Sequence, residues 1–297
     1  MSLTQDIRDA FARRDNALNQ LIIINGLVFA VLIILRAIFF ITQSPAYALI
    51  LRWLALSSDG PTLLYHPWTL LSYAFVHEGF LHIVFNMLNL YWFGQLIREY
   101  LGDRRLVSLY ILGALAGALL FLLAYNFVPA LQPYVGQSVI GASAAVTAVI
   151  VAAATLLPDF TFMLFILGPV KIKWIATAVV LISLAGINGG NPGGEISHLG
   201  GALLGFFFIK RLKAGSDMGT PVVAVGEWVG RLFSQGPSMR VTHRQAAAAT
   251  RVGSSKGTGS SAAGQDEIDL ILDKISHSGY ESLSKDEKQK LFRASQQ

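Results

Sequence analysis

Four polar side chains stand in otherwise apolar stretches of this chain, and their types suit acyl transfer. Ser143 lies in "GASAAV", His198 in "EISHLGGALLG", and His82 and Asn86 lie in "LHIVFNMLN". A serine hydroxyl becomes an effective nucleophile when a nearby base such as histidine takes its proton. We therefore interpret Ser143 as a nucleophile and His198 as its general base. The Ser143 backbone N–H, His82 and Asn86 are then candidate donors to the oxyanion formed when a carbonyl is attacked.

Each of these residues also has a structural interpretation. A lone histidine in an apolar helix more often bonds a neighbouring carbonyl than does chemistry, and Ser143 alone is more typical of close helix packing. His82 and Asn86 are four residues apart and can bridge two helices. Glu195 lies one turn before His198 and is interpreted as a helix cap, which leaves a Ser-His dyad rather than a triad.

The elements that would position these residues are membrane spans. The chain has 297 residues, of which 53% are hydrophobic and 14% charged, which is typical of a membrane protein. Six apolar runs are long enough to cross or nearly cross a bilayer, at about 21–42, 79–97, 106–127, 139–157, 172–188 and 195–210. The segment 160–170 is too short to span and is expected to lie at the interface or to turn back. Residues 43–78, rich in Trp and Tyr, are expected to form a loop lying in the membrane interface.

The basic residues predict how the spans are oriented. They flank alternate span ends, whereas the opposite loops contain only Arg52. The positive-inside rule then puts both termini in the cytoplasm and starts the second, fourth and sixth runs at the outer face. Because each of those runs carries its polar residue a few positions from its start, the four side chains are predicted to lie at similar depth. Gly201 and Gly205 share the His198 face and would let a neighbouring helix approach closely.

Composition excludes several function classes. The chain has no cysteine, which rules out disulfide scaffolds, thiolate metal sites and a cysteine nucleophile. The net charge of +5 is attributed to topology, and nucleic acid is not expected as a partner. Neither a metal nor another cofactor is expected.

Outside the membrane part, the sequence predicts three further segments. Residues 1–19 are predicted to be a cytoplasmic amphipathic N-terminus before a membrane domain at 20–212. Residues 213–265 are predicted to be a flexible cytoplasmic linker. Residues 266–297 show two helical patterns, the second opened by a capping box of Ser284 and Glu287. They are interpreted as a small helical motif that binds an unknown partner.

Taken together, three motifs resemble the rhomboid intramembrane serine proteases. They are H-x-x-x-N at His82 and Asn86, a G-x-S element at Gly141 and Ser143, and H-x-x-G-x-x-x-G at His198, Gly201 and Gly205. The resemblance covers about residues 20–212 and implies an all-α bundle of six transmembrane helices with a membrane-embedded first outer loop. It further implies a Ser143–His198 dyad, oxyanion donors at His82 and Asn86, and helix-packing roles for Gly141, Gly201 and Gly205.

The resemblance implies a function as well as a fold. The expected substrates are single-span membrane proteins, cut in or near their transmembrane segment, and the expected location is a bacterial inner membrane with the site facing outward. His77 resembles a family position with a structural role. Ala144 stands where the family usually has glycine, and Thr147 where relatives often have a tyrosine that stacks on the catalytic histidine.

Two other functions stay open at this stage. One is a catalytically inert rhomboid-like protein that binds and escorts membrane spans. The other is a six-helix transporter, which lacks support because the sequence shows no paired carboxylates or interrupted helices in matching halves.

Overall fold

The computed structural model describes residues 5, 16–164, 168–233, 269–275 and 282–294. The chain separates into two compact units, residues 1–236 and residues 237–297. Most of the predicted amphipathic N-terminus, residues 1–19, lies outside the described residues, and its last three residues belong to α2 (Ala17–Ile41).

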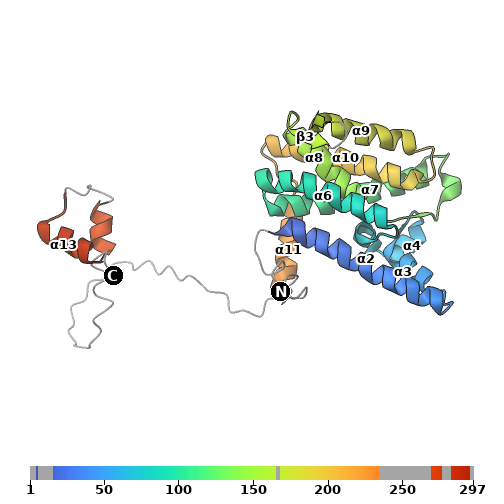
Figure 1. Ribbon diagram of the computed structural model, residues 1–297, viewed down its shortest axis with the longest axis horizontal. Coiled ribbons are helices and arrows are strands. Elements are labelled where there is room, and N and C mark those ends of the chain that lie inside the picture. The colour runs from blue at the N-terminus through green and yellow to red at the C-terminus, as the bar shows by residue number, and fades with distance from the viewer. Residues whose placement is uncertain (1–4, 6–15, 165–167, 234–268, 276–281, 295–297) are drawn as a thin grey trace. The chain divides into compact units, whose positions relative to one another are not determined.

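Six of the described helices form the main bundle of the first unit (Figure 1). They are α2 (Ala17–Ile41), α6 (Phe80–Leu101), α7 (Asp103–Phe127), α8 (Ser143–Leu156), α9 (Ile172–Gly186) and α10 (Pro192–Lys213). Among the described helices, α2, α6 and α7 are long and apolar enough to cross a membrane by length and composition, whereas α8 and α9 are shorter apolar helices. The predicted all-α membrane bundle is confirmed.

Helix α8 occupies the middle of the bundle. Ten of its fourteen residues are buried, and they occur on every side of the helix. Most of these are alanine and valine, and a helix that is small and apolar all round can be surrounded closely by its neighbours. Helices α6, α7, α9 and α10 all contact it. The residue at the start of α8 is therefore held by a rigid, buried element.

The first loop contains several short helices. They are α3 (Ala46–Leu54), α4 (Gly60–Tyr65), α5 (Thr69–Ser72) and the 3₁₀ turn η1 (Tyr73–Phe75). The indole rings of Trp53 and Trp68 stack with centroids 5.5 Å apart, and Trp68 Nε1 donates to the Trp53 carbonyl at 2.7 Å. Both rings remain about half exposed, at 55% and 44%. An exposed aromatic pair of this kind suits the predicted interfacial position of residues 43–78.

Two short strands connect this loop to the start of α8. Strand β1 (Leu56–Ser57) pairs antiparallel with β2 (Ser138–Val139), and Leu56 lies opposite Val139. The turn η2 (Gln132–Tyr134) precedes β2. The pairing fixes the segment just before Ser143 against the first loop.

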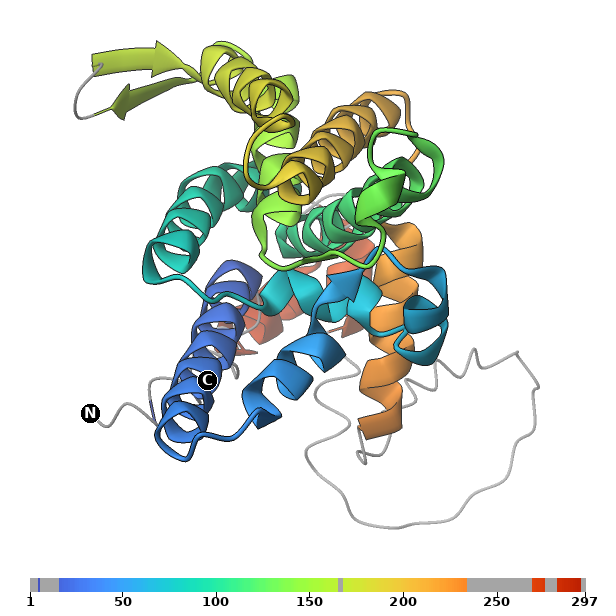
Figure 2. The same cartoon turned by 90° about the vertical axis from the view of Figure 1, so that its right-hand side faces the viewer.

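The segment 160–170 turns back, which is one of the two outcomes expected for it. Strands β3 (Thr161–Leu164) and β4 (Gly168–Lys171) pair antiparallel (Figure 2). Asp159 lies at the base of this hairpin, and Lys171 and Lys173 each donate to Oδ1 at 2.9 Å. Bonds from Lys173 and Lys171 lower the pKa of Asp159 to about 2, so it stays ionised at neutral pH.

The prediction of a flexible linker over residues 213–265 is wrong for the first part of that segment. Residues Thr220–Phe233 form helix α11, which contacts α7. The helix forms because Val225, Trp228, Val229 and Leu232 follow a helical apolar pattern. The prediction missed this pattern because the composition further along the chain is rich in Gly, Ser and Ala. Residues 234–268 lie outside the described residues.

In the second unit, the predicted capping box is confirmed. Residues 269–275 are helical, and α13 spans Lys285–Ala294. The Ser284 N–H donates to Glu287 Oε2 at 2.7 Å, and the Glu287 N–H donates to Ser284 Oγ at 3.3 Å. Lys274 Nζ also bonds Glu287 at 2.9 Å, which ties the two helices together. The predicted Gly279 turn lies outside the described residues.

Candidate active site

Ser143 is the first residue of α8, at the end of an anchored turn. The Gly141 N–H donates to the Tyr73 carbonyl at 2.9 Å, and the Ala142 N–H donates to His77 Nε2 at 3.3 Å. Because Ser143 begins the helix, its own backbone N–H has no carbonyl one turn earlier to bond. A nucleophile at this position would therefore carry its own oxyanion donor. His77 has a structural contact here, as the resemblance implied.

Gly141 lies in the turn before α8, close to His82 of α6, and its expected helix-packing role stays a prediction. It precedes α8 with a φ of 123°, a backbone conformation that residues with a Cβ rarely adopt. A Cβ added there would lie 2.7 Å from Cε1 and 2.8 Å from Nε2 of His82, and 3.7 Å from Ser143 Oγ. The missing side chain thus leaves room for the imidazole of His82 beside the Ser143 hydroxyl.

The imidazole of His198 is held through one ring nitrogen. Nδ1 lies 3.0 Å from Ser183 Oγ on α9 and 3.2 Å from Glu195 Oε2 on α10. In the tautomer with a proton on Nδ1, the ring donates to the carboxylate and Nε2 keeps its lone pair. That tautomer is the one a general base for serine needs.

Glu195 is not the helix cap that the sequence suggested. Asn191 caps α10, since its Oδ1 accepts from the Gly194 N–H at 3.0 Å. The Glu195 carboxylate packs against Gly186 at the end of α9, where an added Cβ would lie 2.9 Å from its Cδ. The carboxylate is thereby held between Gly186 and the ring of His198.

Two glycines on α10 bring it close to α8. A Cβ added at Gly201 would overlap the Ala144 carbonyl, and one added at Gly205 would overlap the Ala148 carbonyl. Gly201 lies one turn after His198, and Ala144 directly follows Ser143. One of these two close approaches, at Gly201 and Ala144, therefore lies within one turn of both His198 and Ser143.

Asn86 lies next to His82 on α6 but bonds within its own helix. Its side chain is 7% exposed, and Nδ2 donates to the His82 carbonyl at 2.9 Å. The amide nitrogen carries a second N–H. That N–H is the one available to a developing oxyanion.

Some expected contacts are not formed in the described residues. The structure records no hydrogen bond between Ser143 Oγ and His198. Thr147 Oγ1 donates to the Ser143 carbonyl at 2.7 Å, one turn back along its own helix.

Among the described residues, no group of three or more His, Cys, Asp or Glu side chains is arranged to hold a metal ion.

Sequence reasoning missed the partners of His198 on α9. Ser183 is 3% exposed and Gly186 follows three residues later, so both small residues lie on the α9 face toward α10. Small residues are enriched where apolar helices pack closely, and "ISLAG" contains three of them, Ser183, Ala185 and Gly186.

Comparison with known proteins identifies relatives of both units. The family described as "Rhomboid domain" matches residues 65–213, and a family of unknown function, DUF6576, matches residues 261–297. The chain is 32% identical over 158 residues to "RHOMBOID-like protein 12, mitochondrial" of Arabidopsis thaliana, covering 50% of this chain and 47% of that protein.

Two further relatives come from yeast and bacteria. "Rhomboid protein 1, mitochondrial" of Saccharomyces cerevisiae is 32% identical over 187 residues, which cover 62% of this chain and 52% of that protein. "Rhomboid protease GlpG" of Pectobacterium atrosepticum is 29% identical over 89 residues, 30% of this chain and 32% of that protein. The chain spans about half the length of its mitochondrial relatives and about a third of the bacterial one.

Proposed function

Because the chain belongs to the rhomboid family, we propose that it is an intramembrane serine endopeptidase with Ser143 as nucleophile and His198 as general base. One observation carries the proposal. His198 Nδ1 is bonded to Ser183 and Glu195, and its helix packs closely against α8 beside Ser143. A histidine placed only for packing would not need two polar partners at one nitrogen.

The proposed reaction follows from these positions. His198 Nε2 takes the Ser143 proton while Oγ attacks the scissile carbonyl. The oxyanion accepts from the Ser143 backbone N–H, His82 and Asn86. The tetrahedral intermediate collapses to an acyl-enzyme as the imidazolium gives its proton to the leaving amine. Water, activated by the same imidazole, then releases the acid.

The proposed substrates are single-span membrane proteins, since a site between apolar helices is reached most directly by another helix in the bilayer. The charge pattern supports a site that faces the outer side, with both termini in the cytoplasm. A bacterial inner membrane is the proposed location. Relatives named as mitochondrial and chloroplastic make an organelle membrane the main alternative.

A covalent probe tests the proposal. An activated serine should react with a fluorophosphonate or isocoumarin, whereas an ordinary serine hydroxyl does not on the same timescale. We expect a single adduct by intact-mass analysis in detergent, absent in Ser143→Ala and strongly reduced in His198→Ala. Adduct formation should rise as His198 loses its proton with increasing pH, because only neutral imidazole accepts a proton.

Ser197→Ala is the matched control. Ser197 lies one residue before His198 and bonds the Gly193 carbonyl at 2.8 Å within α10. It should label at the parental rate. Folded protein that forms no adduct and cuts no single-span substrate would instead be an inert span-binding relative.

A further inference from the structure

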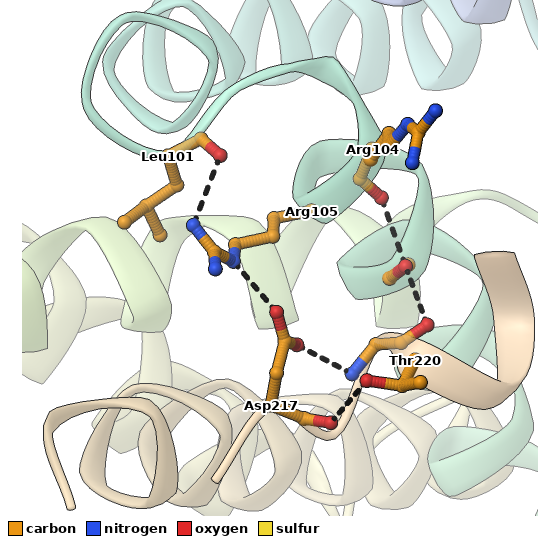
Figure 3. Close-up of polar contacts among 7 residues, drawn as sticks. Leu101, Arg104, Arg105, Asp217 and Thr220 are labelled. Carbon is orange, nitrogen blue, oxygen red and sulfur yellow. Dashed lines mark hydrogen bonds and ion pairs between the residues drawn. The ribbon is translucent and has the colours of Figure 1, made fainter. Parts of the chain in front are cut away.

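Helix α11 lies at the end of the bundle where α10 stops, and polar contacts hold it there. Asp217 Oδ2 accepts from Arg105 Nε at 2.8 Å, and Asp217 Oδ1 accepts from the Gly219 N–H at 2.8 Å (Figure 3). Partial burial raises the pKa of Asp217, but these bonds outweigh it and hold that pKa below its ordinary value. The ion pair is therefore formed at neutral pH.

Two more contacts extend this connection. Ser108 Oγ on α7 lies 3.3 Å from the Gly219 carbonyl, and Arg104 pairs with Glu227 at 3.4 Å. A cleft of about 620 Å³ lies beside these residues, so the first half of α11 is joined to the bundle by polar contacts rather than by tight packing.

The opposite side of α11 is an apolar stripe. Val225, Trp228, Val229 and Leu232 follow the spacing of one helix face and are 61%, 61%, 39% and 62% exposed. Glu227 and Arg231 lie on the other side of the helix, as does Gly230. In the first unit, then, no described residue covers the stripe substantially.

The direction of α11 matches an interfacial helix. In two views that differ by a quarter turn about the vertical, α11 runs vertically (Figures 1 and 2), whereas α6, α7 and α10 run across Figure 1. A helix perpendicular to the spans is parallel to the membrane plane. It begins seven residues after the last residue of α10, whose last turn carries three basic side chains.

The charge around α11 favours an anionic surface. Residues 210–233 carry four basic and two acidic side chains, and Lys210, Arg211 and Lys213 lie in the last turn of α10. Basic residues beside an amphipathic helix are attracted to anionic headgroups, and Trp is favoured at that depth.

We propose that the apolar stripe of α11 is a membrane-binding surface that inserts into an anionic lipid leaflet, with the basic end of α10 facing the headgroups. The occupant of the stripe is thus lipid rather than protein. This proposal is independent of the proposed catalysis.

Site-specific labelling tests it, since the chain has no cysteine of its own. Val225→Cys places an environment-sensitive fluorophore on the stripe. Gly230→Cys places it on the opposite side, where an added Cβ meets nothing within 4 Å. The full chain is reconstituted in vesicles of phosphatidylcholine with about one-third phosphatidylglycerol. The vesicles are formed in a solution of iodide, the aqueous quencher, so that iodide is present on both sides of the bilayer.

We expect the label at position 225 to be protected from iodide several-fold relative to position 230, and to be quenched by doxyl lipids. Protection should weaken in pure phosphatidylcholine. Equal iodide quenching at both positions in anionic vesicles would overturn the proposal. Protection at position 225 that is the same in detergent and in both vesicles, without doxyl quenching, would also overturn it, because protein would then cover the stripe.

Discussion

The Nδ1 atom of His198 lies 3.2 Å from Oε2 of Glu195, one helical turn earlier on α10. Both side chains are about one-fifth exposed, so the contact is partly shielded from solvent. A carboxylate on Nδ1 fixes the tautomer of the ring and stabilises the imidazolium that forms when serine gives up its proton. In the proposed mechanism Glu195 would therefore be a positioning residue, and Ser183 Oγ lies 3.0 Å from the same nitrogen.

Glu195→Ala should lower turnover by ~10²-fold, because a misplaced base costs about that much. Glu195→Gln keeps a hydrogen-bond acceptor without charge and should fall between Glu195→Ala and the parent. Cleavage of a single-span substrate in detergent, with kcat and KM separated, measures this, and the loss should lie mainly in kcat. Glu99→Ala, at the exposed far end of α6, is the control. If Glu195→Ala keeps the parental kcat, Glu195 does not position His198, and the proposed site is a dyad of Ser143 and His198 alone.

Asn86→Ala should lower turnover by ~10²-fold with little loss of folded protein, as for other oxyanion donors. Asn89 offers a matched control on the same helix, since its Nδ2 donates to the Phe85 carbonyl at 2.8 Å in the same i to i−4 geometry. Asn89→Ala removes an equivalent intrahelical bond away from Ser143. If Asn86→Ala cleaves the substrate at the same rate as the control Asn89→Ala, Asn86 is a helix-bridging residue only.

Gly201→Ala should destabilise the bundle by about 1–3 kcal/mol, because the new methyl overlaps the Ala144 carbonyl and α10 must move away from α8. Gly26→Ala adds the same methyl to a long apolar helix where nothing lies within 4 Å, and should be neutral or stabilising by up to about 1 kcal/mol, since alanine favours a helix more than glycine does. Thermal unfolding in detergent compares the two. Equal unfolding midpoints for Gly201→Ala and Gly26→Ala would show that α10 can move away from α8 without loss of stability.

The bundle could be predicted from the sequence because its signals are local, and the candidate site residues were chosen from equally local signals. Long apolar runs fixed the six main helices, and polar residues near their ends marked Ser143, His82 and His198. Glu195 was misassigned because its two possible partners, the α10 N-terminus and the His198 ring, are both nearby in sequence. The structure decides between them, because Asn191 caps α10 and the Glu195 carboxylate packs between Gly186 of α9 and the His198 ring.

Helix α11 was missed for a different reason. Its stripe is short, and the glycines at 226 and 230 lower helix propensity within it. The ion pair between Arg105 and Asp217 joins residues 112 positions apart, which no local pattern reveals.

The capping box of the second unit should make α13 sensitive to acid. The Ser284 N–H, Lys274 and Ser284 Oγ lower the pKa of Glu287 to about 2. The ordinary pKa of a glutamate is 4.5. A lowered folded-state pKa means that the stabilisation is fully present above the unfolded value and is lost as pH falls toward the folded one. Amide protection at Ser284 and Glu287, measured by hydrogen exchange on the full chain, should therefore fall between about pH 4.5 and 2.

Two variants separate this effect from general acid unfolding. Glu287→Gln lacks the titrating group, so its protection should be lower at neutral pH and flat over the same range. Asp286→Asn removes the adjacent carboxylate of the same first turn and should keep the pH dependence of the parent. If Glu287→Gln shows the same acid loss as the parent, the carboxylate of Glu287 does not set the acid response of α13, and another group in the second unit must do so.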